Sequence, residues 1–390
     1  MKIAIFSDSF YPDINGVANT VLESAQNLSD AGHSVLVCAP SSCTKEQLTD
    51  RFGEKFEVRK IPSVPFFGYS DVRMAFPNGS AFFRFIKNKF RPDIIHSHTF
   101  FGVGWEAVAH AKLLKIPLIG THHTFYDHYL KHVKLDYSWA KKLSWRVTVA
   151  YYNLCDSIIS PSRALGKELN SRGLKKNIEF IPNSINELFF KPMPSAGEKK
   201  ELAKKLGLNR PVVVYMGRVS YEKSIDQVLK AFAIFSKRIP KAILMIIGDG
   251  PEKKNLEKLA KRLCIESKTK FTGFLNGQEL LKAMQASDIF VTASKSENMP
   301  LSVLEAMAAG LPVVAAAEKG LPEIVKDGVN GFLVEADRPD LMAHKLYKLA
   351  SQPKLMLKFA MASQTEARQY SKEAVTQKLV NTYNQLIKTI

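Results

Sequence analysis

The stretch Asp288–Ala317, DIFVTASKSENMPLSVLEAMAAGLPVVAAA, decides the fold class of this 390-residue chain. It contains an apolar, β-branched run at 288–294, a helical pattern that ends at Gly310, and a second apolar run at 312–317. Short strands that are apolar throughout and alternate with helices are typical of a parallel sheet covered by helices on both faces. The stretch therefore predicts an α/β fold with a doubly wound sheet.

The same alternation of strand and helix continues along the rest of the chain, and a change in composition divides it into two series. At 191–210, prolines and a stretch rich in lysine and glutamate interrupt the pattern, which predicts a linker. We therefore predict two Rossmann-like, doubly wound domains, 1–190 and 211–370, with a C-terminal helix at 371–390 completing the first. The predicted strands lie at 3–8, 34–40, 93–98, 116–123, 157–162 and 178–183 in the first series, and at 211–218, 242–250, 269–275, 288–294, 312–317 and 331–335 in the second.

Two carboxylates flank the start of the helix in the stretch quoted first. Glu297 lies in the loop before this helix, and Glu305 lies one turn inside it. The backbone N–H groups of Leu301 and Ser302 begin the helix, where a diphosphate would be stabilised. Carboxylates beside that point can accept hydrogen bonds from sugar hydroxyls. The alternative is a surface Glu297 and a Glu305 that only stabilises the helix start, and the strand–loop–helix context weakens it.

A second candidate group follows the strand at 211–218. Gly217 and Arg218 end this strand, and Lys223 comes shortly after them. Two cations at the carboxyl end of a strand can neutralise a pyrophosphate and the charge that develops on it as a leaving group. The alternative is an ordinary exposed pair in a turn. Because doubly wound sheets bind ligands at the carboxyl ends of their strands, we expect the two domains to face each other across a central cleft.

The first domain offers two further loops. Asn15-Gly16 follows the first strand, and Gly16 allows the backbone to approach a phosphate closely, although Asn-Gly alone indicates only a turn. The other loop holds His122 and His123. Adjacent histidines on extended backbone point in opposite directions, and the chain contains no D-x-D sequence, so a metal site is not favoured. We expect one histidine to face the cleft as a hydrogen-bonding group.

Nine motifs are spread along the chain: FSDSFYPDINGVANTV, PDIIHSHTFFGVG, GTHHTFYDHY, PNSI, GRVSYEK, IIGDGPEKKNLE, FTGFL, SENMPLSVLEAMAAGLPVVA and GLPEIVKDGVNGFLV. Taken together, they resemble the motifs of the retaining, GT-B-fold glycosyltransferases of family 4. The resemblance runs from end to end and is far more specific than any single motif. Within that family, the segments 11–20 and 121–130 look most like the membrane-surface enzymes that glycosylate diacylglycerol or related lipids.

The resemblance implies a role for each matching residue. Glu297 would contact hydroxyls of the donor sugar, Glu305 the ribose, and His123 the region of the sugar 6-hydroxyl. No covalent nucleophile, metal or other cofactor is expected, and catalysis would come from positioning and charge stabilisation during front-face attack. The implied catalytic residues are His123, Arg218, Lys223 and Glu297, with the two cations on the diphosphate. The implied donor-binding residues are Gly16, Gly217, Gly273, Leu275, Leu301, Ser302 and Glu305, where Gly273–Leu275 would hold the base.

Two departures from the family pattern affect these expectations. The family often has two glycines where this chain has Asn15-Gly16, which bears on the flexibility of that loop. Many members carry Phe-Gly or Gln-Gly after the first glutamate, whereas this chain has Met299-Pro300. Pro300 offers no N–H, so fewer amides remain for a phosphate.

The net charge of +18 implies an anionic partner or, alternatively, a solvated basic surface. Two stretches of the first domain, 82–91 and 131–146, combine cations with large aromatics and almost no acids. This combination predicts docking on an anionic membrane surface, where cations meet headgroups and rings enter the interface. The alternative is that the rings belong to the core and the cations to a solvated face. The candidate acceptor or membrane contacts are Tyr126, Lys87, Lys89, Lys141 and Lys142.

No run approaches the roughly 20 apolar residues of a membrane span, and the apolar run after Met1 is shorter than a signal-peptide core. The four cysteines lack metal-binding spacing and are interpreted as reduced thiols. These observations predict a cytoplasmic protein that is peripheral on the inner face of the cell membrane.

The leading hypothesis is transfer of a hexose, glucose from UDP-glucose, to a membrane lipid such as 1,2-diacylglycerol. A family 4 enzyme that acts on phosphatidylinositol, or on a soluble, polysaccharide or cell-wall acceptor, is the alternative. A nucleotide-sugar epimerase shares the architecture but would act on the donor without an acceptor. A nucleic-acid partner is not expected, because no known nucleic-acid-binding module occurs in the sequence.

Overall fold

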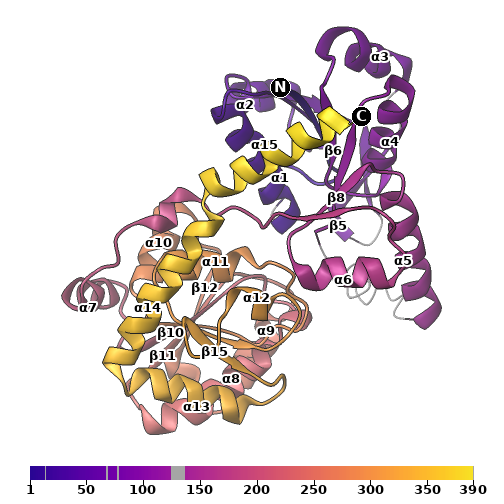
Figure 1. The fold of residues 1–390 in the computed structure, drawn as a ribbon. Helices are drawn as coiled ribbons and strands as arrows, with labels where there is room; N and C mark the ends of the chain where they lie inside the picture. The colour runs from indigo at the N-terminus through magenta and orange to yellow at the C-terminus, as the bar shows by residue number, and fades with distance from the viewer. Residues whose placement is uncertain (14, 67–68, 77–78, 124–136, 390) are drawn as a thin grey trace. The chain divides into compact units, whose positions relative to one another are not determined.

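The computed structural model describes residues 1–13, 15–66, 69–76, 79–123 and 137–389. The chain forms two compact units (Figure 1). The first comprises Met1–Ser184 together with Lys372–Ile390, and the second comprises Ile185–Ser371. The C-terminal helix α15 (Lys372–Thr389) therefore packs with the N-terminal part of the chain, where it contacts helix α1 (Gly16–Asp30).

The first unit is built on a parallel sheet that has seven strands among the described residues. Its strand order is β3-β2-β1-β6-β7-β8-β9, so the chain reverses direction across the sheet after β3. A separate antiparallel pair, β4 (Ser63–Phe66) and β5 (Tyr69–Ala75), follows β3. The bounds of the sheet strands are β1 Lys2–Phe6, β2 Ser34–Ala39, β3 Glu57–Lys60, β6 Ile94–Ser97, β7 Leu118–Thr121, β8 Ser157–Ser160 and β9 Ile178–Phe180.

Helices cover both faces of this sheet because its strands are apolar on both sides. Ile3 and Ile5 of β1 belong to a core under α1, α2 and α15, whereas Ala4 and Phe6 belong to a core under α3 to α6. This is the alternation expected when successive side chains of a strand point to opposite faces. The bounds not yet given are α2 Lys45–Phe52, α3 Gly79–Arg84, the π-helical turn η1 Phe85–Phe90, α4 Gly102–Leu114, α5 Ser138–Tyr152 and α6 Arg163–Ser171.

The second unit has the same architecture, with a parallel sheet of six strands in the order β12-β11-β10-β13-β14-β15. Cores lie on both faces of this sheet. Its strands are β10 Val212–Met216, β11 Ile243–Ile247, β12 Thr269–Gly273, β13 Ile289–Thr292, β14 Val313–Ala316 and β15 Gly331–Val334. Its helices are η3 Glu187–Phe190, α7 Ala196–Lys205, η4 Tyr221–Lys223, α8 Ile225–Arg238, α9 Lys253–Arg262, η5 Glu266–Lys268, α10 Gly277–Gln285, α11 Leu301–Ala308, α12 Leu321–Ile324, α13 Pro339–Ala350, α14 Pro353–Ala367 and η6 Arg368–Tyr370.

The predicted linker at 191–210 is wrong, because this segment is part of the second unit. Ser195 and Glu198 form a capping box that begins α7, in which Glu198 Oε2 accepts from the Ser195 amide at 2.7 Å. Ala203 and Leu208 are buried in the core of the unit. A local capping signal and two apolar anchors therefore order a stretch whose composition resembles that of a linker.

The twelve predicted strands are all present, with ends that differ by a few residues from the prediction. The sequence analysis did not identify α2, β3 or the β4–β5 pair, which lie in a segment without a clear apolar period. In the part of the chain that the structure describes, no helix has both the length and the apolar character that crossing a bilayer requires.

Candidate functional site

In the second unit, the turns that follow neighbouring strands are joined by backbone hydrogen bonds at the carboxyl end of the sheet. The Gly217 amide donates to Ile247 O at 3.0 Å, and the Gly248 amide donates to Gly273 O at 2.8 Å. Gly248 has a φ of +130°, and a Cβ there would lie 2.0 Å from Gly217 O. Only glycine fits this close approach. Two of the predicted donor-binding glycines, Gly217 and Gly273, thus share one hydrogen-bonded edge, and Gly248 is a member that the sequence analysis missed.

Lys223 and Glu297 form an ion pair at this edge. Lys223 Nζ lies 2.6 Å from Glu297 Oε1, and each side chain is 16% exposed. Lys223 ends the short helix η4 after β10, and Glu297 lies in the loop after β13, which is the neighbour of β10 in the sheet. An ammonium has three N–H donors and a carboxylate has several acceptor positions, so this bond exhausts neither group. The structure brings together two of the predicted catalytic residues.

Arg218 follows β10 at the same end of the sheet, and its side chain is exposed. Tyr215, which is buried in β10, donates its hydroxyl to Arg218 O at 3.1 Å and so holds the main chain of the turn. Burial raises the pKa of Tyr215 well above its ordinary value, and the negative charges of Glu297 and Glu222 raise it further. Tyr215 therefore remains a neutral donor, while the cationic side chain of Arg218 is left at the surface.

Helix α11 places the remaining predicted donor contacts. Pro300 is its N-cap, and the first bonds to Pro300 O are donated by Val303 at 3.1 Å and Leu304 at 3.2 Å. The amides of Leu301 and Ser302 precede these bonds, and both residues are half-buried, as is Glu305. Pro300 thus sets the start of α11, and two N–H groups follow it at the positive end of the helix.

In the first unit, Gly16 begins α1. The side chain of Asn15 caps this helix: Oδ1 accepts from the Ala18 amide at 2.9 Å, and Nδ2 donates to Ser9 Oγ at 2.8 Å. Asn15 is therefore a helix cap in this chain, where the family often has glycine. No described atom lies within 4 Å of where a Gly16 Cβ would stand. The fold itself does not require glycine at position 16, so any such requirement would come from a ligand.

A group of histidines occupies the carboxyl ends of β6 and β7, which are adjacent strands. His96 and His98 are buried, and His123 is half-buried. His98 Nδ1 lies 3.0 Å from His123 Nε2. His96 is bonded through both ring nitrogens, to the hydroxyl of Tyr383 on α15 and to Thr121 Oγ1, at 2.6 Å each. Residues at i and i+2 of a strand share a face, which explains why His96 and His98 lie together.

His122 points to the opposite face, as the prediction for adjacent histidines required. Its ring lies 5.1 Å from that of Tyr152 and 6.0 Å from that of Trp145, measured between centroids. Burial lowers the pKa of His96 and of His122 to about 3, and that of His123 to about 4. These rings are therefore neutral at physiological pH, and His96 and His123 act as hydrogen-bonding groups and not as charges.

Three residues near this group, His96, His98 and Asp8, are not predicted as site residues from the sequence. The two histidines form an H-x-H pattern that only the sheet order brings beside His123. Asp8 is buried and accepts from Thr99 Oγ1 at 2.5 Å and from the Val103 amide at 2.8 Å. Burial raises the pKa of Asp8, and these hydrogen bonds oppose the increase. Asp8 thereby caps the start of α4, and we assign it a structural role.

The predicted interfacial character of 82–91 is wrong for its aromatic residues. Phe82 is buried in the core, and Phe85 and Phe90 pack against the same core. Arg59 covers the Phe85 ring, with its guanidinium carbon 3.8 Å from the ring centroid. The cations Lys87 and Lys89 remain exposed. The turn η1 faces the sheet, so its rings cover apolar core instead of reaching a bilayer.

Helix α5 behaves differently, because large apolar side chains on it stay in solvent. Trp139, Leu143 and Val147, spaced four residues apart, are 60%, 51% and 41% exposed, and we call these three residues the α5 ridge. Lys142 and Arg146 are exposed one position before two members of the ridge, and α5 contains no acid. Lys141 is half-buried and Trp145 is buried. An exposed apolar row with cations beside it is the pattern of an interfacial helix.

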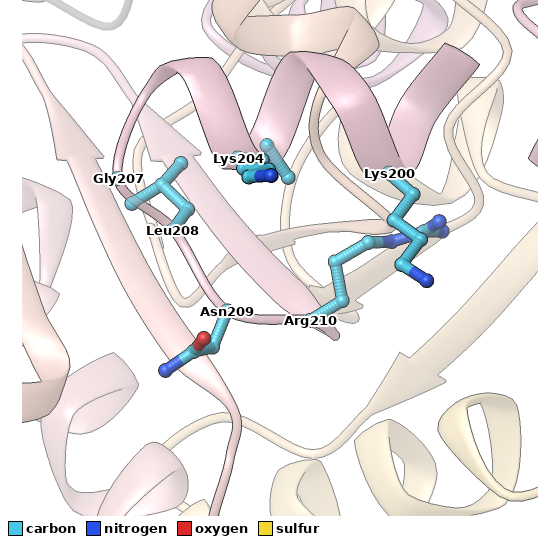
Figure 2. A pocket seen from close by; sticks show the side chains of 7 residues that line it. Lys200, Lys204, Gly207, Leu208, Asn209 and Arg210 are labelled. Carbon is cyan, nitrogen blue, oxygen red and sulfur yellow. The ribbon is translucent and has the colours of Figure 1, made fainter. Parts of the chain in front are cut away.

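Part of the predicted acceptor or membrane site is not covered by the structure. Tyr126 and the segment 131–136 fall outside the described residues. Within the described residues, no cluster of three or more histidine, cysteine, aspartate or glutamate side chains could hold a metal ion. A hollow in the second unit lies beside α7 and contains none of the predicted site residues (Figure 2). It is lined by Lys200, Ala203, Lys204, Gly207, Leu208, Asn209 and Arg210.

Comparison with known proteins identifies the family. The model of Glycosyltransferase Family 4 matches residues 14–187, and that of Glycosyl transferases group 1 matches residues 198–366. An alpha-monoglucosyldiacylglycerol synthase of Streptococcus pneumoniae (strain ATCC BAA-255 / R6) is 31% identical over 378 residues, which cover 90% of this chain and 83% of that protein. A protein of the same name from Acholeplasma laidlawii is 29% identical and covers 99% of this chain and 98% of its own length.

A further relative and a solved structure are also similar to this chain. A GDP-mannose-dependent alpha-mannosyltransferase of Corynebacterium glutamicum is 29% identical over 86% of this chain and 77% of its own length. The crystal structure of Anabaena HepE in complex with UDP matches with a TM-score of 0.80 and 22% identity, over 99% of this chain and 100% of that one. The chain belongs to the GT-B glycosyltransferases that combine a family 4 domain with a group 1 domain, as its motifs predicted.

Proposed function

We propose that this glycosyltransferase is a retaining hexosyltransferase that moves glucose from UDP-glucose to a membrane lipid such as 1,2-diacylglycerol. The observation that carries the lipid acceptor is the α5 ridge: three large apolar side chains are exposed in a row, beside Lys142 and Arg146. The names of the two bacterial relatives support glucose as the sugar and diacylglycerol as the acceptor.

The second unit would bind the donor. Arg218 and Lys223 would neutralise the diphosphate, with the amides of Leu301 and Ser302 as further donors at the start of α11. Glu297 would accept from sugar hydroxyls and Glu305 from the ribose. The ion pair between Lys223 and Glu297 at 2.6 Å supports this arrangement, because it holds a cation for the phosphate next to an acceptor for the sugar before any ligand binds.

The protein would catalyse the transfer by positioning donor and acceptor and by stabilising the charge of the leaving diphosphate. As the bond from the sugar to the diphosphate breaks, negative charge grows on the leaving oxygen, and fixed cations at that point lower the barrier. The diphosphate itself can take the proton of the acceptor hydroxyl, so no protein nucleophile is required. Arg218 and Lys223 would supply the positive charge, and we therefore expect full activity in the presence of EDTA.

The first unit would bind the lipid acceptor and would also add two contacts to the donor. His123 would contact the sugar 6-hydroxyl, and the amide of Gly16 at the start of α1 would face the diphosphate. The α5 ridge would enter the interface of an anionic membrane while Lys142 and Arg146 meet its headgroups. We accordingly propose a peripheral location on the inner face of the cell membrane.

The test is sedimentation of the purified full-length chain with vesicles that contain phosphatidylglycerol and diacylglycerol. We expect binding by the wild type that decreases with salt, because exposed charges are screened within about 10 Å at 0.1 M salt. The triple variant Trp139→Ser, Leu143→Ser, Val147→Ser should bind at least about tenfold more weakly, because burying each large apolar side chain fully is worth about 1.5–3 kcal/mol. Glucosyl transfer to diacylglycerol in the same vesicles should decrease in parallel.

A matched control is available in the second unit. Leu357 and Met361 are 59% and 55% exposed and lie four residues apart on α14. The variant Leu357→Ser, Met361→Ser removes a similar exposed apolar pair and should leave vesicle binding unchanged. Stabilisation by UDP should be the same in all three proteins. If the wild type does not sediment with vesicles, or if the triple variant binds equally well, the lipid acceptor is abandoned in favour of a soluble one.

Three alternatives to this function share the site. The mannosyltransferase among the relatives favours a screen of GDP-mannose beside UDP-glucose, and activity with GDP-mannose alone would replace the proposed donor. Transfer to phosphatidylinositol, or to a polysaccharide or cell-wall acceptor, is measured in the same assay by exchanging the acceptor. An epimerase would change the donor in the absence of any acceptor.

A further inference from the structure

His98 lies between two other histidines at the carboxyl end of the first sheet. It follows β6 directly and is 2% exposed. Its Nδ1 lies 3.0 Å from His123 Nε2, so one of these two nitrogens donates a hydrogen bond to the other. Nε2 of His98 has no hydrogen-bond partner among the described residues.

His96 keeps the ring of His98 in one orientation. Both ring nitrogens of His96 are engaged, with Tyr383 on one side and Thr121 on the other. The centroids of the His96 and His98 rings are 4.0 Å apart, and those of His98 and His123 are 5.1 Å apart. A rotation of His98 would therefore have to displace a neighbour that is itself bonded at both ends.

The protonation of this pair follows from its surroundings. Burial lowers the pKa of His98 well below its ordinary value and that of His123 to about 4, so each neutral ring carries one proton. If His123 donated from Nε2, the proton of His98 would lie on Nε2, where no described residue accepts it. If His98 donates from Nδ1, only a lone pair is left without a partner. A buried N–H without an acceptor is rarer and costs about 1–3 kcal/mol, so the second arrangement is favoured.

We propose that His98 is a positioning residue for His123: it donates from Nδ1 to His123 Nε2 and thereby holds the proton of His123 on Nδ1. His123 then presents an N–H donor, which suits an oxygen of the donor sugar as the acceptor. The step that concerns the sugar rests on the proposed function, whereas the position of the proton on His123 does not.

The first experiment measures the proton directly. Full-length protein labelled with ¹⁵N in its histidines is studied by long-range ¹H–¹⁵N correlation, in which protonated and unprotonated ring nitrogens have well-separated shifts. The variant His123→Gln assigns the signals of His123. We expect the wild type to show His123 protonated at Nδ1 and His98 protonated at Nδ1. A His123 ring protonated at Nε2 in the wild type overturns the proposal.

Two substitutions of His98 separate the hydrogen bond from the packing. The amide nitrogen of His98→Asn occupies roughly the place of Nδ1 and can donate to His123, whereas His98→Leu cannot. We expect His123 to keep its Nδ1 proton in the asparagine variant and to lose this preference in the leucine variant. His110→Leu is the control, because His110 is another buried histidine of the same unit that bonds Glu106 O at 2.8 Å. It should leave His123 unchanged.

The functional measurement uses UDP-glucose and its 6-deoxy analogue. His98→Leu should raise the KM for UDP-glucose about fivefold to tenfold, since one hydrogen bond is worth about 1 kcal/mol, and should leave the KM for the 6-deoxy donor unchanged. His98→Asn should recover the wild-type KM for UDP-glucose. If the proton lies on Nδ1 but neither KM responds, the donor contact of His123 is overturned while the positioning role of His98 stands.

Discussion

The candidate sites of the two units are held in place by different forces. In the first unit, His96, His98 and His123 are neutral and form hydrogen bonds at the carboxyl ends of β6 and β7. In the second, Lys223 and Glu297 are charged and lie half-buried at the rim, 2.6 Å apart. Packing fixes the first set before any ligand arrives. The second set is fixed by mutual attraction, so an incoming diphosphate can compete for it.

The difference indicates how binding and stability are divided between the units. A neutral network contributes hydrogen bonds but no net charge, whereas a half-buried cation adds Coulombic stabilisation of growing negative charge at a low local dielectric. We therefore expect substitutions of the cations in the second unit to affect turnover, and substitutions of the buried histidines in the first to affect the sugar contact and the response of stability to pH. Three predictions test this division and the role of the glycines in each unit.

The largest effect should come from the cations of the second unit. Arg218→Ala and Lys223→Ala should each lower kcat/KM by about 10²–10³, as the loss of a transition-state donor typically does. The factor by which the double variant lowers kcat/KM should be smaller than the product of the two single-variant factors, because both cations act on one diphosphate. Lys230→Ala on α8 breaks an exposed pair with Asp226 and serves as the control. If the loss in the double variant equals the product of the two single losses, the two cations act independently.

Alanine should reduce stability strongly at Gly248 in the second unit and only slightly at Gly16 in the first. Gly248→Ala should lower the free energy of unfolding of the second unit by more than about 3 kcal/mol, because its Cβ would lie 2.0 Å from Gly217 O at a φ of +130°. Gly16→Ala meets no described atom within 4 Å and should change stability by less than about 1 kcal/mol.

If the amide of Gly16 faces the diphosphate, Gly16→Ala should still weaken the binding of UDP. Chemical denaturation followed by circular dichroism, together with a titration of UDP, measures both quantities. A Gly248→Ala protein as stable as the wild type would contradict the close approach, and unchanged UDP binding by Gly16→Ala would remove Gly16 from the site.

The smallest effect should be a change in acid sensitivity of the first unit. The pKa of His122 is about 3 in the folded chain and about 6.5 in the unfolded chain, so between these values only the unfolded chain binds the proton. The free energy of unfolding must therefore fall as the pH falls through that window. Between pH 7.5 and 5.5, His122→Phe should lose about 1.4 kcal/mol less than the wild type.

The measurement is urea unfolding followed by tryptophan fluorescence. All three tryptophans of the chain, Trp105, Trp139 and Trp145, belong to the first unit. The same loss of stability in variant and wild type would mean that His122 is already protonated, or accessible to protons, in the folded chain.

The two basic stretches show what residue content alone could not decide. In 82–91 and in 131–146, which overlaps α5, cations are interleaved with aromatics in the sequence, and the sequence predicts that both stretches dock on a membrane. The structure turns the rings of the first stretch into the core and leaves the α5 ridge in solvent. Which side of a helix faces the sheet depends on its packing partners, and neither composition nor charge specifies them.

The sequence by itself determined the α/β class, the twelve strands and the family, because apolar strands, glycine turns and motifs are local signals. It also named Lys223 and Glu297, since each follows a strand. Only the tertiary structure decided that these two form a pair, that Tyr383 of the C-terminal helix bonds His96, and that His98 contacts His123. Such contacts join residues from separate strands and helices, and the order of strands in the sheet, not their spacing in the chain, makes them neighbours.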